Sequence, residues 1–132
     1  MVLTLPTLDE ELRAKLEPRA SNIKNRLEVI NKIHEAGITI GVACIPLMPY
    51  ISDYEHDLES LIKIVAEVGA DYVIADMVNF KEEASSRVLQ FLKENKPKLL
   101  SKYADLYQNK YCNSDYASNK RKIANALIKK IK

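Results

Sequence analysis

The alternation of apolar and polar positions predicts three strands in the first part of the chain, at residues 2–5, 38–45 and 71–76. The first is a short apolar run that a proline ends, since proline cannot donate to a central ladder. The second is almost continuously apolar and rich in β-branched residues, which is typical of a parallel strand covered on both faces. We expect a loop after it, because Pro46 and Pro49 follow.

A short helix is predicted directly after the first strand, over residues 9–16. Thr7 or Asp9 is the expected N-cap, since a side-chain oxygen there can accept a hydrogen bond from a helix N–H. Pro18 ends this helix, because proline cannot donate the next backbone hydrogen bond.

Two longer helices connect the three strands. The first begins after a cap at Ser21 or Asn22 and ends at Gly37, a residue suited to the left-handed conformation after a helix. Its apolar residues recur at spacings that place them on one face, namely Ile23, Leu27, Ile30 and Ile33. The second covers residues 57–68 and ends before Gly69. Helices between consecutive strands indicate a βαβαβ unit with parallel strands, so the predicted fold class is α/β.

This alternation of strands and helices stops after residue 80. Three further helices are predicted, over residues 82–94, 99–107 and 116–132. We therefore divide the chain into a β/α part, residues 1–80, and a helical C-terminal extension, residues 81–132, that packs on it.

Composition and charge narrow the classes of protein. The chain has 132 residues, 47% of them hydrophobic, which suffices for one domain with its own core. The net charge of +2 is too small to indicate nucleic acid by itself. The segment from Lys93 to the end contains eleven Lys or Arg and only three acids. A solvated helical face is the favoured explanation of this excess of positive charge. The sequence lacks a leader pattern and an apolar stretch of about 18 residues, so we expect a cytoplasmic protein without a membrane span.

The two cysteines, Cys44 and Cys112, lie far apart, and neither has a Cys or His at metal-ligand spacing. This arithmetic excludes a zinc site or a complete iron–sulfur site on this chain alone. Reduced thiols are favoured over a disulfide. Cys44 is expected in the core, because its neighbours are apolar.

Polar residues follow each predicted strand, at the edge where parallel strands collect ligands. Loops converge at this edge, and helix N-termini offer N–H donors there. The set contains Thr4, Thr7, Asp9, Glu17 and Arg19, then the segment from Pro46 to Asp53, and finally Asp76 and Asn79. The pattern therefore predicts one polar rim at the carboxyl ends of the three strands.

Several of these residues also have a structural explanation. Arg19 can pair with a carboxylate or phosphate of a ligand, or with Glu17 at the surface. Arg26 can point back to the rim, although the outer helix surface is slightly favoured. Asp53 is favoured as a helix N-cap or turn residue. Asp76 is evenly balanced between a functional and a structural role, because acids are rare in strands.

Histidines and tyrosines are weaker candidates. His34, in the last turn of a predicted helix, is expected to stabilise the helix dipole, and His56 has no second metal ligand nearby. Four tyrosines are interleaved with basic residues in the C-terminal extension, namely Tyr103, Tyr107, Tyr111 and Tyr116. This pattern suits nucleic-acid binding or packing of the extension on the β/α part, and packing is favoured.

A series of short motifs between Thr4 and Ala70 carries a family resemblance. The motifs are Thr7-Leu8-Asp9, Glu17-Pro18-Arg19, Arg26-Leu27, Ile30, Ala36-Gly37-Ile38, Pro46, Pro49, Asp53 and Gly69-Ala70. Together they resemble the C-terminal half of radical SAM proteins of the spore photoproduct lyase and DNA repair photolyase-like group. The resemblance implies the fourth to sixth strands of a partial (βα)6 barrel, followed by a helical extension. The family usually has Gly where this chain has Tyr50 and Asn where it has Ser52.

The resemblance also implies binding of S-adenosylmethionine (SAM) at the strand ends. In the family, a Cys-x3-Cys-x2-Cys loop holds a [4Fe–4S] cluster, which cleaves SAM to a 5′-deoxyadenosyl radical. By this resemblance, Thr4, Glu17 and Arg19 face the methionine or ribose part of SAM, and the segment from Pro46 to Asp53 faces the adenine. The cluster motif is missing from this sequence, so the cluster has to come from a partner half.

Two hypotheses follow from the resemblance. In the first, the chain is a fragment or split half of a radical SAM enzyme, inactive alone and completed by a second chain that carries the cluster. In the second, it is a degenerate, non-catalytic α/β protein with a binding or interaction role. An unrelated α/β binding domain is a weaker third option. A half-barrel exposes the edge of its first strand, so a partner chain or self-association is expected.

Overall fold

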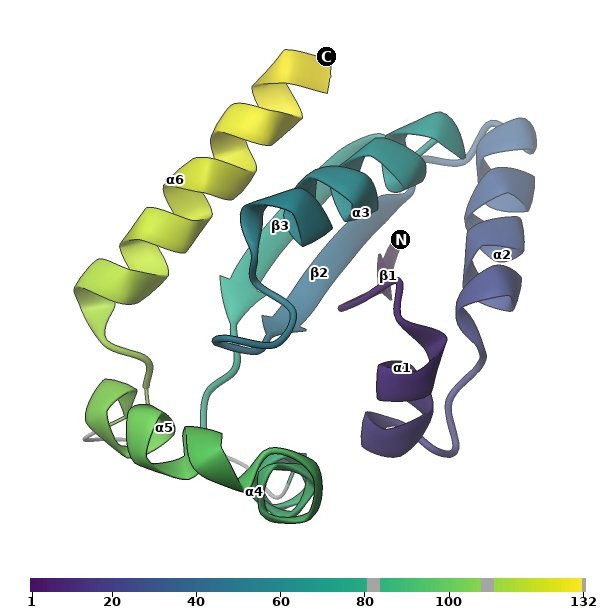
Figure 1. Cartoon of the computed structure of the whole chain (residues 1–132). Helices are drawn as coiled ribbons and strands as arrows, with labels where there is room; N and C mark the ends of the chain where they lie inside the picture. The colour runs from purple at the N-terminus through teal and green to yellow at the C-terminus, as the bar shows by residue number, and fades with distance from the viewer. Residues whose placement is uncertain (81–83, 108–110, 132) are drawn as a thin grey trace.

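The computed structural model describes residues 1–80, 84–107 and 111–131. Its centre is an open sheet of three parallel strands, β1 (Val2–Thr4), β2 (Gly41–Leu47) and β3 (Tyr72–Met77), in the order β1-β2-β3. Parallel strands joined by helices confirm the predicted α/β class (Figure 1).

The helices agree with the predicted ones to within a few residues. In chain order they are α1 (Glu10–Leu16), α2 (Ile23–Glu35), α3 (Glu55–Glu67), α4 (Ala84–Asn95), the short 3-10 helix η1 (Pro97–Leu99), α5 (Leu100–Leu106) and α6 (Ser114–Ile131). The predicted start of α4 at residue 82 and the predicted end of α6 at residue 132 lie outside the described residues. Across the described ranges, no helix combines the length and the apolar character needed to cross a membrane.

Local sequence sets the ends of the first two helices. Asp9 accepts a hydrogen bond from an α1 N–H and Asn22 accepts one from an α2 N–H, at 3.2 and 2.8 Å. These two residues, rather than Thr7 and Ser21, are therefore the N-caps. Gly37 follows α2 with a φ of 76°, a conformation that glycine adopts without steric cost.

The second strand differs from its prediction at both ends. It begins at Gly41 and continues through Pro46, so the prediction of a loop at Pro46 was wrong. The hydrogen-bonded ladder between β2 and β3 is irregular between Cys44 and Leu47. Pro46 therefore has no paired residue on β3 that would need a backbone N–H from it, a group that proline lacks. On its other side β1 has already ended at Thr4.

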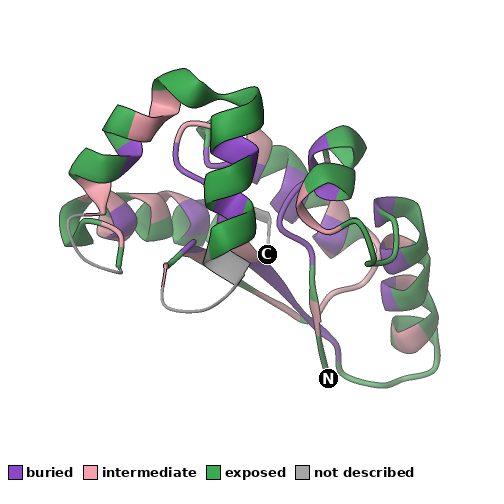
Figure 2. Cartoon of the chain, turned by 90° about the horizontal axis from the view of Figure 1, so that it is seen from below, coloured by how far each residue is buried: buried purple, intermediate pink, exposed green. Residues whose placement is uncertain are grey.

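The helices α2, α3 and α6 cover one face of the sheet. Side chains of α2 and α3 pack on alternate residues of β2, including Val42 and Cys44, which are fully buried. Side chains of α6 pack between α3 and Met77 of β3. Figure 2 shows the buried positions along the strands and on the inner sides of the helices, with exposed positions on their outer sides. The main core is therefore one-sided.

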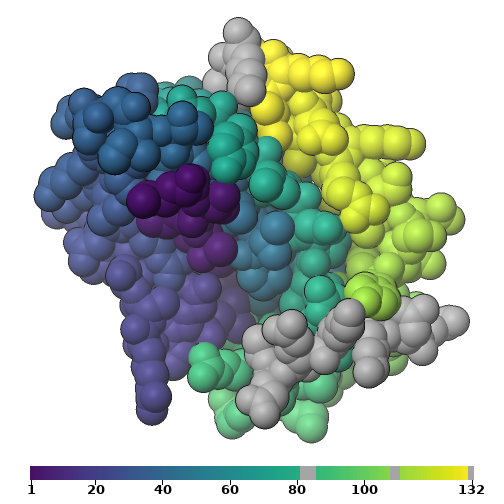
Figure 3. Space-filling model, turned by 180° about the vertical axis from the view of Figure 1, so that it is seen from behind, coloured from purple at the N-terminus to yellow at the C-terminus, as the bar shows by residue number. Residues whose placement is uncertain are grey.

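The opposite face of the sheet is not covered by any described helix. Val2 and Ile74 keep 52% and 47% of their surface exposed there, and Thr4 is also exposed. Thr4 and Ile74 both lie beside Ala43 in register, so all three point to this same face. Figure 3 views this side of the molecule, where the strands are seen directly. We call it the open sheet face.

Candidate functional site

The five residues expected to face a cofactor lie in two places. Thr4 ends β1 and is joined to Glu17 through Arg26, and Arg19 lies in the exposed loop after α1, whereas Pro46 and Asp53 lie at the end of β2 and in the loop after it. Pro46 is half-buried, and its peptide bond with the preceding residue is cis. The contacts of the other residues decide which of them are accessible to a ligand.

Arg26 connects Thr4 with Glu17. The Arg26 guanidinium donates from Nη2 to the Glu17 carboxylate at 2.6 Å and from Nη1 to the Thr4 carbonyl oxygen at 3.2 Å. Its side chain is buried, so the favoured place on the outer helix surface was wrong and the alternative, toward the rim, is correct. The Glu17 carboxylate is consequently engaged by an arginine of its own chain.

The Thr4 carbonyl lies on the free edge of the sheet. β1 bonds to β2 through the carbonyl of Met1 and the N–H of Leu5, and the bonding direction alternates along a strand. The backbone groups of Val2 and Thr4 therefore point away from β2. Arg26 satisfies the Thr4 acceptor on this edge, while the Val2 groups have no such partner in the described chain.

Arg13 is a second buried guanidinium, which sequence reasoning missed. Its Nε donates to the Glu10 carboxylate at 2.6 Å, and its Nη1 donates to the carbonyl oxygens of Glu17 and Ala20 at 2.9 and 3.0 Å. The i,i+3 spacing of the acid and the arginine is a readable signal, but the carbonyl contacts are not. These bonds fix the loop that carries Arg19, whose exposed side chain makes no ion pair with Glu17.

Asp53 is a buried carboxylate that joins the loop after β2 to the last helix. It is 1% exposed, and it accepts hydrogen bonds from the Tyr50 backbone N–H at 3.0 Å and from the Tyr116 hydroxyl at 2.6 Å. The Lys120 ammonium donates to the Asp53 backbone carbonyl at 3.1 Å and lies 3.8 Å from its carboxylate. The expected N-cap role is wrong, since Tyr54 occupies the N-cap position of α3.

Tyr50 occupies the tightest position of the same loop. Its φ is 62°, a left-handed conformation that favours glycine. The Tyr50 ring lies 5.7 Å from the Tyr116 ring, and the Lys102 ammonium lies 5.0 Å from its centroid. Ring contacts therefore hold a side chain whose backbone is strained.

Two tyrosines of the extension attach α5 to the ends of β2 and β3. The Tyr103 hydroxyl donates to the Pro49 carbonyl oxygen at 2.8 Å, and the Tyr107 hydroxyl donates to the Val78 carbonyl oxygen at 2.6 Å. Burial raises the pKa of both hydroxyls far above the ordinary tyrosine value. They therefore act as neutral donors that hold the extension in place, as the packing explanation requires.

The remaining candidates are an ion pair and the thiols. Asp76 accepts a hydrogen bond from Arg121 at 2.9 Å, and both side chains are about half exposed. Burial raises the pKa of the Cys44 thiol to about 12, and Cys112 is a free thiol on the approach to α6. Among the residues that the structure describes, no three His, Cys, Asp or Glu side chains are grouped to hold a metal ion.

The described residues thus form an α/β protein with an open parallel sheet and helices on one of its faces. No family model matches the chain. It is similar to an uncharacterized protein, ORF301, of Acidianus two-tailed virus, with 36% identity over 80 residues, which are 58% of this chain and 27% of that protein. It is also similar to an uncharacterized protein of Mycobacterium tuberculosis, with 26% identity over 108 residues, which are 82% of this chain and 32% of that protein.

The chain spans about a third or less of the length of these curated relatives. No solved structure matches it.

Proposed function

We propose that the chain is the C-terminal half of a radical SAM-type barrel, a fragment or split subunit that is inactive without a chain carrying the [4Fe–4S] cluster. The main support for this proposal is that helices cover only one face of the sheet. Barrel strands line an interior and keep their helices outside, whereas a doubly wound sheet has helices on both faces. The greater length of the relatives, of which the matched segment is 27% or 32%, also supports it.

In this proposal the residues of this chain contact SAM but provide no ligands for the cluster. Cys44 is buried in β2 and the described residues contain no metal-holding group, so the proposal assigns the cluster to the partner chain. There the cluster supplies the reductive cleavage of SAM. This chain contributes Thr4, Arg19 and Pro46 at accessible positions toward SAM. Glu17 and Asp53 act indirectly, by fixing the loops at the ends of β1 and β2 through Arg26 and Tyr116.

The partner chain adds a strand to the free edge of β1. The outward backbone groups of Val2 offer a donor and an acceptor for such a strand. Arg26 already binds the next outward acceptor, the Thr4 carbonyl, so the added ladder ends at that residue. The same strand brings the second half of the barrel over the open sheet face.

Anaerobic co-expression with a cluster-bearing N-terminal half tests the proposal. We expect a complex, visible iron–sulfur absorption and SAM cleavage only in the mixture. The substitution Val2→Pro removes an outward N–H and leaves the inward bonds of Met1 and Leu5, so it should abolish the complex. Val29→Thr, at an exposed position of α2, is the matched control. A mixture that neither associates nor binds SAM contradicts the proposal.

A non-catalytic α/β binding or interaction protein is the second candidate. The engagement of Glu17 and Asp53 by residues of the same chain favours it, because both carboxylates expected to face SAM are then already used. It predicts self-association through the open sheet face, or binding of nucleic acid by the basic extension. Light scattering of the purified chain and a salt-dependent gel-shift assay distinguish these outcomes from the split enzyme.

A further inference from the structure

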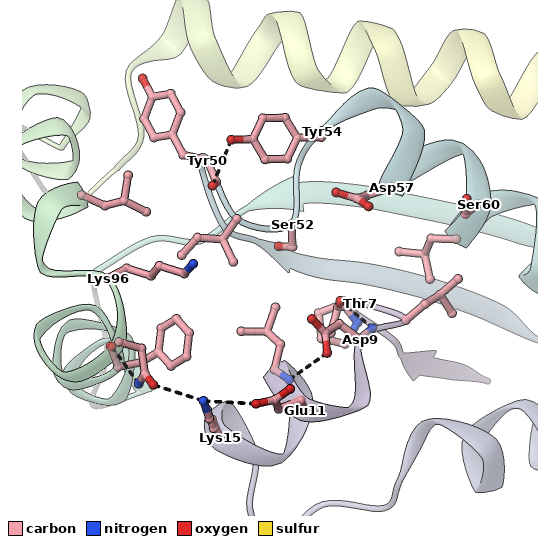
Figure 4. Close-up of a pocket in the computed structure, with 18 of the residues that line it drawn as sticks. Thr7, Asp9, Glu11, Lys15, Tyr50, Ser52, Tyr54, Asp57, Ser60 and Lys96 are labelled. Atoms are coloured by element: carbon pink, nitrogen blue, oxygen red, sulfur yellow. Dashed lines mark hydrogen bonds and ion pairs between the residues drawn. The ribbon is translucent and has the colours of Figure 1, made fainter.

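A cavity of about 930 Å³ lies among the helices beside the strand ends. Its lining residues come from loops and helices and none comes from a strand, so it is separate from the open sheet face. Four parts of the chain enclose it: the loop before α1 with α1 itself, the loop after β2, the first turns of α3, and the junction of α4 with η1 (Figure 4). Its volume is within the range of small-molecule sites.

Positive charge lines one side of this cavity. Lys96 and Lys98 come from the junction of α4 with η1, and neither ammonium forms an ion pair with a described residue. Figure 4 shows the Lys96 side chain extending into the cavity. A third lysine, Lys15, is already used, because its ammonium donates to Asn95 at 3.1 Å and lies 3.6 Å from the Glu11 carboxylate.

Negative charge lines the opposite side. Asp9 and Asp57 come from the cap of α1 and the first turn of α3, and Figure 4 shows both carboxylates directed toward the cavity. Asp9 uses one oxygen to cap α1. Asp57 pairs at 3.1 Å with His56, a side chain that is 82% exposed and therefore weakly held. Both carboxylates thus keep acceptor capacity for a ligand.

The floor between the two charged sides is apolar. It contains Leu12, Ile51, Leu61, Phe91 and Leu99. An apolar floor favours a ligand with an apolar body, because the area that the ligand removes from water contributes to its binding.

We propose that this cavity binds a zwitterion with an apolar body, of the class of short peptides with free termini. The peptide carboxylate pairs with Lys96 and Lys98, and its ammonium pairs with Asp57 and Asp9. A simple anion is disfavoured by the two carboxylates, and a simple cation is disfavoured by the two lysines. A single amino acid would cover less of the apolar floor than a dipeptide does. This inference is independent of the split-enzyme proposal, since it needs no partner chain.

Titration calorimetry of the whole chain with the dipeptide Leu-Leu tests this inference. N-acetyl-Leu-Leu lacks the ammonium and Leu-Leu-amide lacks the carboxylate. We expect each to bind at least about tenfold more weakly than Leu-Leu, the loss of one charge-assisted hydrogen bond. Free leucine and inorganic phosphate should bind more weakly still. Absence of Leu-Leu binding, or equal binding of the acetylated peptide, overturns the inference, as does phosphate binding as tight as that of Leu-Leu.

Two substitutions assign the two ends of the ligand. Lys96→Gln should weaken Leu-Leu by about tenfold and leave Leu-Leu-amide unchanged, because the amide has no carboxylate to lose. Asp57→Asn should weaken Leu-Leu and leave N-acetyl-Leu-Leu unchanged. Lys129→Gln, at an exposed position of α6 outside the cavity, is the matched control. Equal effects of either substitution on all three peptides contradict the proposed orientation.

Discussion

The Tyr116 hydroxyl donates a 2.6 Å hydrogen bond to the Asp53 carboxylate, although 63 positions separate the two residues in the sequence. The carboxylate is 1% exposed and also accepts the Tyr50 N–H, so it depends on protein donors rather than on water. A buried carboxylate that loses a donor pays a desolvation cost that a surface carboxylate avoids. This contact therefore fixes α6 against the loop that follows β2.

Replacing Tyr116 with phenylalanine tests the strength of this contact. Tyr116→Phe keeps the ring and removes the donor, and it should lower the free energy of unfolding by about 1.5–3 kcal/mol, the range for hydrogen bonds to charged groups. Tyr54→Phe is the matched control, because its exposed hydroxyl donates at 3.2 Å to a neutral carbonyl. Urea denaturation measures both. Equal losses in the two variants would show that Asp53 does not depend on Tyr116.

Stability should fall at alkaline pH because of the buried tyrosines. Burial raises the pKa of Tyr103, Tyr107 and Tyr116 above the ordinary value of 10.0. Below pH 10 these hydroxyls are protonated in both states, and their contribution is complete. Above it the unfolded chain releases protons that the folded chain keeps, so the free energy of unfolding decreases as the pH rises. Tyr103→Phe should flatten this slope by up to about 1.4 kcal/mol per pH unit. Urea denaturation at several pH values measures the slope, and an unchanged slope would contradict the prediction.

The Arg26–Glu17 pair should be energetically coupled. The two groups are 2.6 Å apart, and their side chains are only 8% and 29% exposed. In a double-mutant cycle with Arg26→Gln and Glu17→Gln, we expect a coupling energy of about 1–2 kcal/mol. The Lys15–Glu11 pair is the control, since its 3.6 Å contact is largely exposed and should give less than about 0.5 kcal/mol. Similar coupling in both cycles would argue against a special role of Arg26.

Most of the fold could be predicted from the sequence, because the residues that set the helix ends act through local contacts. Asp9, Asn22 and Gly37 act at helix ends through contacts within a few residues, and sequence alone places such contacts well. Pro46 was misread because its tolerance depends on a ladder irregularity opposite β3, which the sequence of β2 does not contain.

The candidate site was less predictable because its contacts join distant segments. Asp53 looked like a cap for the helix that follows it, yet its partners Tyr116 and Lys120 come from α6. Arg26 binds Glu17 and Thr4, and only the packing of α2 against β1 brings these three residues together. The left-handed backbone of Tyr50 was not predicted either, because tyrosine gives no local signal for a positive φ.

The two thiols should differ in accessibility. Cys44 is fully buried, and burial raises its pKa to about 12, so little thiolate exists at neutral pH. Cys112 is half-buried and lies in the segment just before α6. A thiol reagent such as a disulfide dye should therefore label Cys112 in the folded protein and label Cys44 only on unfolding. The single variants Cys44→Ala and Cys112→Ala assign each labelling phase, and rapid labelling of Cys44 in the folded protein would contradict its burial.

The positive φ of Tyr50 should reverse the usual order of alanine and glycine. At most positions alanine is more stable than glycine, but a φ of 62° costs a residue with a Cβ about 1 kcal/mol. Tyr50→Ala loses the ring contacts and keeps the strain, whereas Tyr50→Gly loses the same contacts and relieves it. Tyr50→Gly should therefore be about 1 kcal/mol more stable than Tyr50→Ala in urea denaturation. The exposed Ala104, inside α5, is the control, because Ala104→Gly should lose about 1 kcal/mol. If alanine were the more stable residue at both positions, the left-handed conformation of Tyr50 would be contradicted.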